Sequence, residues 1–168
     1  SAASDVYKRQ VYMMEKTFST YTTDRPDAYA NLIGGPLAPN LEGDIFLYQL
    51  EDGVYIRAFI KGIPPLTVSN FHGFHIHQTG DCTVGDPNNP FTAAGGHFNP
   101  TNQAHPDHAG DLPPILSAHG IGILSVYTDR FMLKDVLGKS FILHEKPDDF
   151  ITQPSGNSGL RLACGVII

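Results

Sequence analysis

Short runs rich in β-branched and aromatic residues, each bounded by Gly, Pro, Asn or Asp, recur along this chain and constrain its fold most strongly. Such runs are typical of β-strands, whereas no segment sustains the apolar spacing of an amphipathic helix. In the run 53–60, aliphatic residues alternate with Tyr55, Arg57 and Phe59, which predicts a strand with one buried face. The pattern predicts an all-β domain, either a sandwich or a flattened barrel. Strands are expected over 28–34, 43–50, 53–60, 70–77, 119–127, 139–145 and 161–168, with a hairpin turn at Asp52-Gly53.

Length and charge limit the organisation and the partners of the chain. Its 168 residues, 41% of them hydrophobic, fit one globular domain. The net charge of −6 and the absence of a Lys/Arg cluster argue against nucleic acid or an anionic membrane as a partner. No apolar stretch approaches the length of a membrane span, and no signal peptide is recognised. As written, the sequence predicts a cytoplasmic protein.

The first residues are treated apart from the fold. The stretch DVYKRQ is what one reading frame of a common sequencing-library adaptor end spells. Residues 1–12 are therefore interpreted as a non-native segment, the alternative being a natural disordered N-terminus. Under the first interpretation Met13 or Met14 is the natural start, or an upstream export signal has been lost and the protein is extracytoplasmic.

Two tracts interrupt the strand pattern. From Asp81 to Ala118 the sequence offers no convincing strand or helix, only Gly, Pro, Asn, Asp and three histidines. A shorter tract runs from Pro147 to Gly159. Structureless segments of such length are uncommon in compact domains unless something functional orders them. The longer tract is therefore expected to carry a site.

Within the longer tract, His97, His105, His108 and Asp111 offer three nitrogens and one carboxylate oxygen. This is the donor set and the number of donors of a closed tetrahedral zinc site. Each histidine alone could equally be a solvated loop residue, so the prediction depends on the four occurring together.

A second group of histidines is expected on strands. His75 and His77 are one residue apart in an apolar run, so in a strand their side chains point to the same face. His144 would join them if the strand ends converge, with a loop histidine as the fourth member. Four imidazoles in a tetragonal arrangement suit Cu(II).

The two cysteines, Cys82 and Cys164, are too few for a disulfide-rich scaffold or a thiolate zinc site. One bridge between them would close a loop of about 80 residues and contribute about 4.5 kcal/mol at most. The residues alone leave open whether they pair or are two unrelated buried thiols.

Five segments occur in the order of the signature segments of the copper/zinc superoxide dismutases: GFHIH, GGHFNP, HAGDLP, HEKPDDF and GNSGLRLACGVI. Through them, residues 27–168 resemble that family, in particular its bacterial members with a compact zinc loop. The resemblance implies an eight-stranded Greek-key flattened barrel or sandwich with long metal-binding and channel loops.

The resemblance also implies one copper and one zinc per chain. The expected copper ligands are His75, His77, His97 and His144, and the expected zinc ligands are His97, His105, His108 and Asp111. His97 would then bridge the two ions through its two ring nitrogens.

A carboxylate and a disulfide are implied as supports of this centre. Asp148 is expected to accept N–H bonds from His75 and His105, as partners of metal-bound histidines commonly do. The family pairs a cysteine in the loop after His-x-His with one near the C-terminus, which matches Cys82 and Cys164.

Two further residues match family positions, and two histidines match none. Arg161 matches the arginine that hydrogen-bonds the substrate anion, where its permanent charge and planar donors suit the task. Ser155 lies where many members have a threonine that narrows the channel. His72 and His119 match nothing and are interpreted as ordinary strand residues.

The implied function is that of a superoxide dismutase, which converts two superoxide anions to dioxygen and hydrogen peroxide by Cu(II)/Cu(I) cycling, with His97 supplying a proton. The alternatives are a non-catalytic copper- and zinc-binding protein of the same fold and a zinc-stabilised structural domain. The segment ITQPSGNSGL before Arg161 has no charged residue, so a shallow dependence of the rate on salt is expected. A homodimer is left open.

Overall fold

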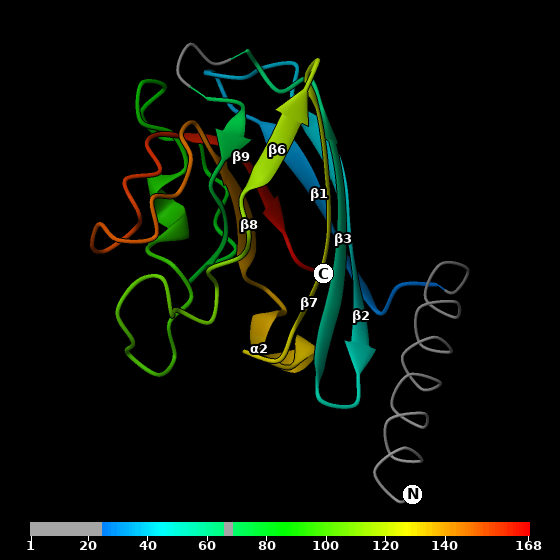
Figure 1. Ribbon diagram of the computed structural model, residues 1–168. Helices are drawn as coiled ribbons and strands as arrows, with labels where there is room; N and C mark the ends of the chain where they lie inside the picture. Colours follow the sequence, from blue (N-terminus) through cyan, green and yellow to red (C-terminus); the bar gives the residue numbers. More distant parts are fainter. Residues whose placement is uncertain (1–24, 66–68) are drawn as a thin grey trace, which may run out of the picture.

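The computed structural model describes residues 25–65 and 69–168, and these form an all-β architecture, as the sequence predicts (Figure 1). Two short helical turns, η1 (Thr92–Ala94, a 3-10 helix) and α2 (Leu133–Val136), lie between strands. The predicted non-native or disordered segment 1–12 lies outside the described residues. The strands are β1 (Ala28–Gly34), β2 (Glu42–Leu50), β3 (Gly53–Lys61), β4 (Phe71–His72), β5 (Phe74–His77), β6 (Ile115–Ala118), β7 (Ile121–Thr128), β8 (Ser140–His144) and β9 (Arg161–Val166).

One antiparallel sheet contains all of these strands, in the order β4-β6-β7-β3-β2-β1-β9-β8-β5. Its two end strands, β4 and β5, are separated only by Gly73, so the chain itself joins the ends and nearly closes the sheet into a barrel. Counted as one interrupted strand, β4 and β5 bring the total to the eight strands that the family resemblance implies, one more than the seven segments predicted from the residues. The connections from β3 to β4 and from β7 to β8 join strands that are not neighbours, as in a Greek key.

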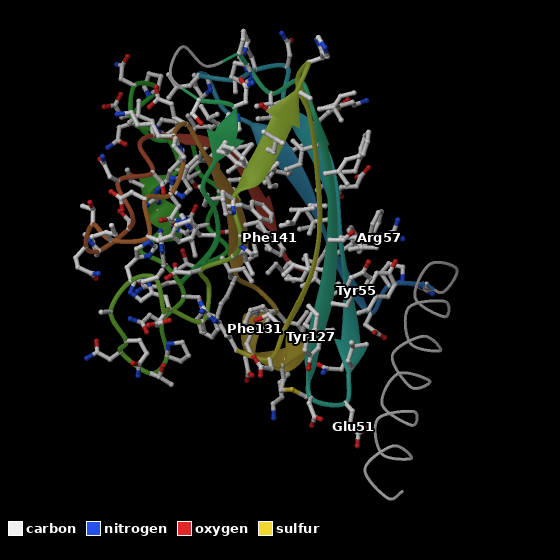
Figure 2. The ribbon with its side chains drawn as sticks, viewed as in Figure 1. Glu51, Tyr55, Arg57, Tyr127, Phe131 and Phe141 are labelled. Atoms are coloured by element: carbon white, nitrogen blue, oxygen red, sulfur yellow. A yellow bond between two sulfur atoms is a disulfide. The ribbon has the colours of Figure 1, made fainter. Side chains whose placement is uncertain are left out.

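The barrel core follows from the alternation along the strands. On β3 the side chains of Val54, Ile56 and Ile60 are fully buried, whereas Phe59 between them is 46% exposed. The rings of Phe74 and Phe141, from the paired strands β5 and β8, stack inside with centroids 5.2 Å apart. Figure 2 shows Phe141 between the barrel walls and Arg57 projecting outward from β3. The strand prediction for this region is confirmed.

The structure differs from the sequence prediction around β6. The segment Ile115–Ala118 is a strand that the prediction missed, because four residues after two prolines give too short a pattern. Its alternation is nevertheless regular, since Ile115 is fully buried and Leu116 is 53% exposed. The predicted strand start at His119 is wrong: His119 and Gly120 form the turn between β6 and β7, both with positive φ (51° and 77°).

The hairpin between β2 and β3 is confirmed one residue from its predicted position. Leu50 pairs with Gly53, so the two turn residues are Glu51 and Asp52. Among the described residues, no helix is both long enough and apolar enough to cross a membrane.

Two long loops cover one side of the barrel: the connection from β5 to β6 and the shorter one from β8 to β9 (Figure 1, green and orange). The disulfide between Cys82 and Cys164 ties the first loop to β9, which confirms the predicted pairing. Phe91 and Ala94 of this loop pack against Cys164 in a small core of their own. The longer tract is therefore ordered by a covalent bond and by packing, and it contains η1.

Candidate metal centre

Strands β5 and β8 place three histidines under the long loops. Along β5, Phe74 and Ile76 enter the barrel core, so His75 and His77 project from the opposite face. His144 ends the neighbouring β8, where the register between β8 and β9 shifts. All three imidazoles are almost completely buried, with exposures of 0%, 1% and 4%.

The loop from β5 to β6 returns to this face through His97, whose backbone bridges to His77. The ring centroids of His75 and His97 are 4.0 Å apart. The Nε2 atoms of His77 and His144 face each other at 3.3 Å. One ring nitrogen from each of these four histidines lies within 4.8 Å of the others, so the strand face and the loop form an all-nitrogen group.

A second group shares His97 and adds donors from the same loop. Its Nδ1 lies 2.7 Å from Oδ1 of Asp111. Oδ2 of Asp111 lies 3.0 Å from Nδ1 of His105 and 3.2 Å from Nδ1 of His108. The donor atoms of these four residues also lie within 4.8 Å of one another. The structure thus brings all seven predicted ligand residues into two groups of four, which have His97 in common.

Unpaired nitrogens test whether the groups fit metal ions. Burying a polar atom without a partner costs free energy, so native structures rarely leave several together. A nitrogen lone pair aimed at a cation removes this cost, and imidazole is a common ligand of copper and zinc. Both groups therefore fit metal ions. In the described part of the chain, four such side-chain atoms lack a hydrogen bond: His75 Nδ1, His97 Nε2, His105 Nδ1 and His108 Nδ1. The last two lie close to Oδ2 of Asp111, but without hydrogen-bond geometry.

Asp148 connects the two groups from the loop between β8 and β9. Its Oδ2 lies 2.7 Å from Nε2 of His75, and its Oδ1 lies 2.8 Å from Nε2 of His105. The backbone N–H of Phe150 also donates to Oδ1. Burial alone would raise the pKa of this carboxyl group, but these hydrogen bonds outweigh it and lower the pKa to about 2. The carboxylate therefore stays ionised and fixes which nitrogen of each ring faces the metal group.

Burial also decides the protonation of the histidines. It lowers the pKa of His97 to about 4, even though the hydrogen bond to Asp111 opposes the shift. It likewise lowers the pKa of His77 and of His144 well below the ordinary value, and neighbouring imidazoles add to both shifts. These rings are neutral near pH 7, which is the form that binds a metal ion.

Arg161, the first residue of β9, lies beside the all-nitrogen group. Its Nη1 donates to the carbonyl of Phe91, and its Nη2 donates to the carbonyl of Gly95 at 2.7 Å. The Gly95 carbonyl also accepts a bond of 2.9 Å from Nδ1 of His77. One carbonyl therefore holds both the guanidinium group and an imidazole of the group. Ser155 lies half-buried in the loop between β8 and β9, next to Gly156.

Sequence reasoning missed the role of His72 on β4. Its ring is completely buried, with Nδ1 3.0 Å from the carbonyl oxygen of His144 and Nε2 3.2 Å from Oγ of Ser117. Because a carbonyl oxygen can only accept, Nδ1–H of His72 donates to His144, and the ring fixes the backbone of a group member. The apolar run around it gave no signal for this contact, since both partners lie at least 45 residues away.

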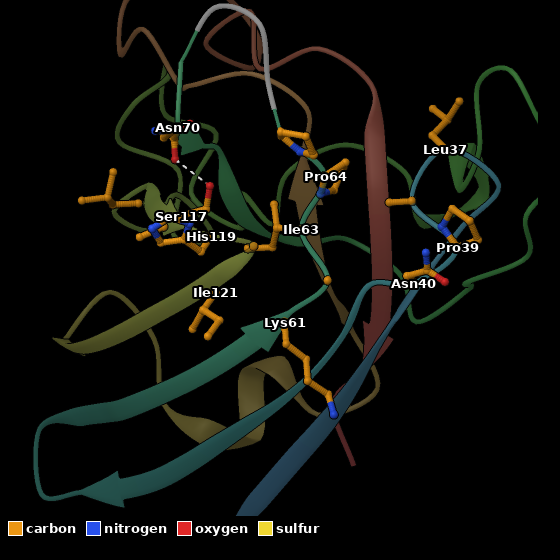
Figure 3. Close-up of a pocket in the computed structure, with 16 residues that line it drawn as sticks. Leu37, Pro39, Asn40, Lys61, Ile63, Pro64, Asn70, Ser117, His119 and Ile121 are labelled. Carbon is orange, nitrogen blue, oxygen red and sulfur yellow. Dashed lines mark hydrogen bonds between the residues drawn. The ribbon is translucent and has the colours of Figure 1, made fainter.

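A large surface concavity of the described structure lies elsewhere. It has a volume of about 1050 Å³ and is lined by residues near the ends of β3, β6 and β7 (Figure 3). Of the described residues that line it, none belongs to either histidine group, and the one histidine present is His119. The two histidine groups are thus formed by buried side chains that do not line this hollow.

Comparison with known proteins agrees with this geometry. A family model for copper/zinc superoxide dismutase matches residues 41–167. The Cu-Zn superoxide dismutase 2 of Aquifex aeolicus is 35% identical over 159 residues, which cover 83% of this chain and 85% of that protein. The Cu-Zn superoxide dismutase of Photobacterium leiognathi is 35% identical over 138 residues, covering 74% and 78%.

A third relative, the superoxide dismutase-like protein YojM of Bacillus subtilis, is 40% identical over 111 residues. That match covers 57% of this chain and 55% of the relative, so the chain spans about half of its length. The family model and the Aquifex relative each cover most of the chain. This protein belongs to the copper/zinc superoxide dismutase family.

Proposed function

We propose that this protein is a superoxide dismutase, which converts two superoxide anions into dioxygen and hydrogen peroxide. The observation that carries the proposal is the pair of buried donor groups that share His97, with Arg161 beside the all-nitrogen group. Bound copper, changing between Cu(II) and Cu(I), supplies the electron transfer that this reaction needs. The names of the Aquifex and Photobacterium relatives support the same activity.

The division of the two metals follows from the chemistry of the donors. Four imidazole nitrogens suit copper, whereas three nitrogens and a carboxylate oxygen suit zinc. The unpaired atoms support this division, because Nδ1 of His97 contacts Asp111 whereas Nε2 is buried without a hydrogen bond and is free for a second ion. We assign copper to His75, His77, His97 and His144, and zinc to His97, His105, His108 and Asp111.

The chain itself contributes binding and proton transfer. Arg161 has five N–H donors in a plane, of which two hold the carbonyls of Phe91 and Gly95, so the remaining donors can bind the superoxide anion. His97 can hold a proton at Nε2 while its Nδ1 stays in the zinc group. Ser155, in the loop over the site, narrows the approach to Arg161. Arg161 thus accounts for the binding of an anionic substrate, and His97 accounts for the supply of a proton during its reduction.

The test combines metal analysis with superoxide consumption on one purified sample. His144→Ala is expected to abolish activity and copper binding while zinc stays bound, because His144 belongs only to the all-nitrogen group. His119→Ala, in the exposed turn between β6 and β7, is the matched control and should change neither. Copper-loaded protein without activity would favour the non-catalytic metal-binding alternative. Loss of zinc in His144→Ala would show that the division of ligands is wrong.

The proposal also covers the bounds of the domain, its cellular compartment and its association. Residues 27–168 contain every donor and are taken as the functional unit. The compartment stays a prediction: the sequence as written predicts the cytoplasm, whereas the disulfide between Cys82 and Cys164 favours an oxidising, extracytoplasmic setting, and fractionation of the source cells decides between them. Association into a homodimer stays a prediction, which sedimentation equilibrium measures directly.

A further inference from the structure

The loop from His105 to Asp111 carries three of the four ligands of the zinc group, yet apart from one bridge between Asp111 and His75 it contains only turns, a bend and irregular backbone. A loop without strand or helix bonds needs contacts from outside to hold its backbone in one arrangement. Asp148 holds the ring of His105, and Gln153 bonds both the N–H and the carbonyl of His105 at the start of the loop. The question is therefore which side chain holds the rest of the loop backbone, from Pro106 to Asp111.

Arg130, two residues after the end of β7, makes that contact. Its Nη1 lies 3.0 Å from the carbonyl oxygen of Pro106, 3.1 Å from that of His108 and 3.3 Å from that of Asp111. Three carbonyls separated along the loop thus converge on one nitrogen. Two of them belong to residues whose side chains are zinc donors, so Arg130 fixes the backbone position of those donors directly.

The chemistry of the contact favours arginine. Hydrogen bonds from a charged donor to carbonyl oxygens are stronger than neutral ones, and a planar guanidinium holds its N–H groups in a fixed fork, of which the two N–H groups on Nη1 are shared by the three carbonyls. The ion pair between Arg130 and Asp107 is a minor contribution, because it is 3.6 Å long and the two side chains are 40% and 72% exposed. The bonds to the carbonyls are what distinguish Arg130 from a surface charge.

We propose that Arg130 is a positioning residue for zinc: it holds the loop from His105 to Asp111 in the shape that the zinc donors require before the ion binds. The proposal rests on the assignment of zinc to this group. If Arg130 orders the loop before zinc binds, zinc binding does not have to supply all of the free energy of ordering the loop. Removing the guanidinium therefore lowers the affinity for zinc. Outer partners of metal sites typically change metal affinity about 10- to 100-fold.

The experiment measures zinc binding to the otherwise metal-free full chain by competition with a chromophoric chelator. Arg130→Met is expected to bind zinc about 10- to 100-fold more weakly, and Arg130→Lys, which keeps the charge but not the fork, should lie between Met and the original protein. Arg57→Met, on the outer face of β3, is the control and should bind zinc normally. The absorption spectrum of bound Co²⁺ reports separately on the geometry of the donors, and Arg130→Met should alter it.

Two outcomes overturn the proposal. If Arg130→Met lowers only the unfolding temperature and keeps the zinc affinity and the Co²⁺ spectrum, Arg130 serves the fold and not the site. If Arg130→Met does not fold, the test depends on Arg130→Lys. A zinc affinity of Arg130→Lys equal to that of the original protein would then overturn the proposal. His108→Ala separates this inference from the proposed function: if that variant keeps full zinc affinity, the zinc assignment itself fails, and with it the role of Arg130.

Discussion

At the scale of single residues, Asp148 offers a direct test of the metal centre, because each of its two carboxylate oxygens contacts a histidine of a different group. In Asp148→Asn one of them becomes an NH₂ group, so either His75 or His105 loses its acceptor. The ring that loses it is no longer fixed in one tautomer, and we expect about 10- to 100-fold weaker metal binding together with reduced activity. Asp149→Asn is the neighbouring control, since the side chain of Asp149 accepts bonds from Ile151 and Thr152 of its own loop and contacts neither histidine group. Equal metal affinities in the two variants would contradict the prediction.

His72 is expected to contribute to stability rather than to metal choice. In His72→Phe the hydroxyl of Ser117 and the carbonyl of His144 lose a buried partner. A buried group without its hydrogen bond costs about 1–3 kcal/mol, so the free energy of unfolding should fall by that order. Urea unfolding of the metal-free protein measures it. His119→Phe should have little effect, because His119 is exposed in a turn.

At the scale of elements, the contact between the two long loops depends on Gly156. Its φ is +63°, and an added Cβ would collide with Oδ1 of Asp148 and lie 2.7 Å from Nε2 of His105. Gly156→Ala is therefore expected to break the Asp148–His105 bond and weaken zinc binding. Gly85→Ala is a matched control, because Gly85 has the same φ of +63° with nothing within 4 Å of the added carbon. If both variants bind zinc equally, backbone strain and not the collision explains any loss of stability.

The elements also show how far sequence reasoning reaches. Alternation along β3 predicts its buried face because burial and exposure follow each residue's own chemistry. Short spacings predict the zinc group and the pair His75 and His77, whose members are close in sequence, whereas His144 is assigned to that pair through the family resemblance. Arg130 and Gln153 were not predicted. Arg130 binds three backbone carbonyls, and Gln153 binds both the N–H and the carbonyl of His105. Backbone N–H and carbonyl groups are nearly the same at every position, so the pattern of side chains in the sequence does not predict which backbone groups a distant side chain will bind.

At the scale of the whole molecule, the buried imidazoles make the stability of the metal-free protein depend on pH. The pKa of His97 is about 4 when folded, below its ordinary value of 6.5. A group whose folded pKa is lowered takes up its proton first in the unfolded chain, so stability is complete above about pH 7 and falls as the pH drops toward 4. His97 alone should remove about 2 kcal/mol between pH 7 and pH 5, and the lowered pKa values of His77 and His144 act in the same direction.

Asp148, with a folded pKa of about 2, adds a further loss only below about pH 4, where the unfolded carboxyl group takes up its proton. Urea unfolding of the metal-free protein at pH 7, 6 and 5 measures the histidine part of this dependence. The metal-loaded protein is the control, since bound ions compete with protons for the same nitrogens and should preserve stability to lower pH. A metal-free protein equally stable at pH 5 and pH 7 would mean that these rings are not held neutral by burial, and the description of the donor groups as ready for metal at neutral pH would fail with it.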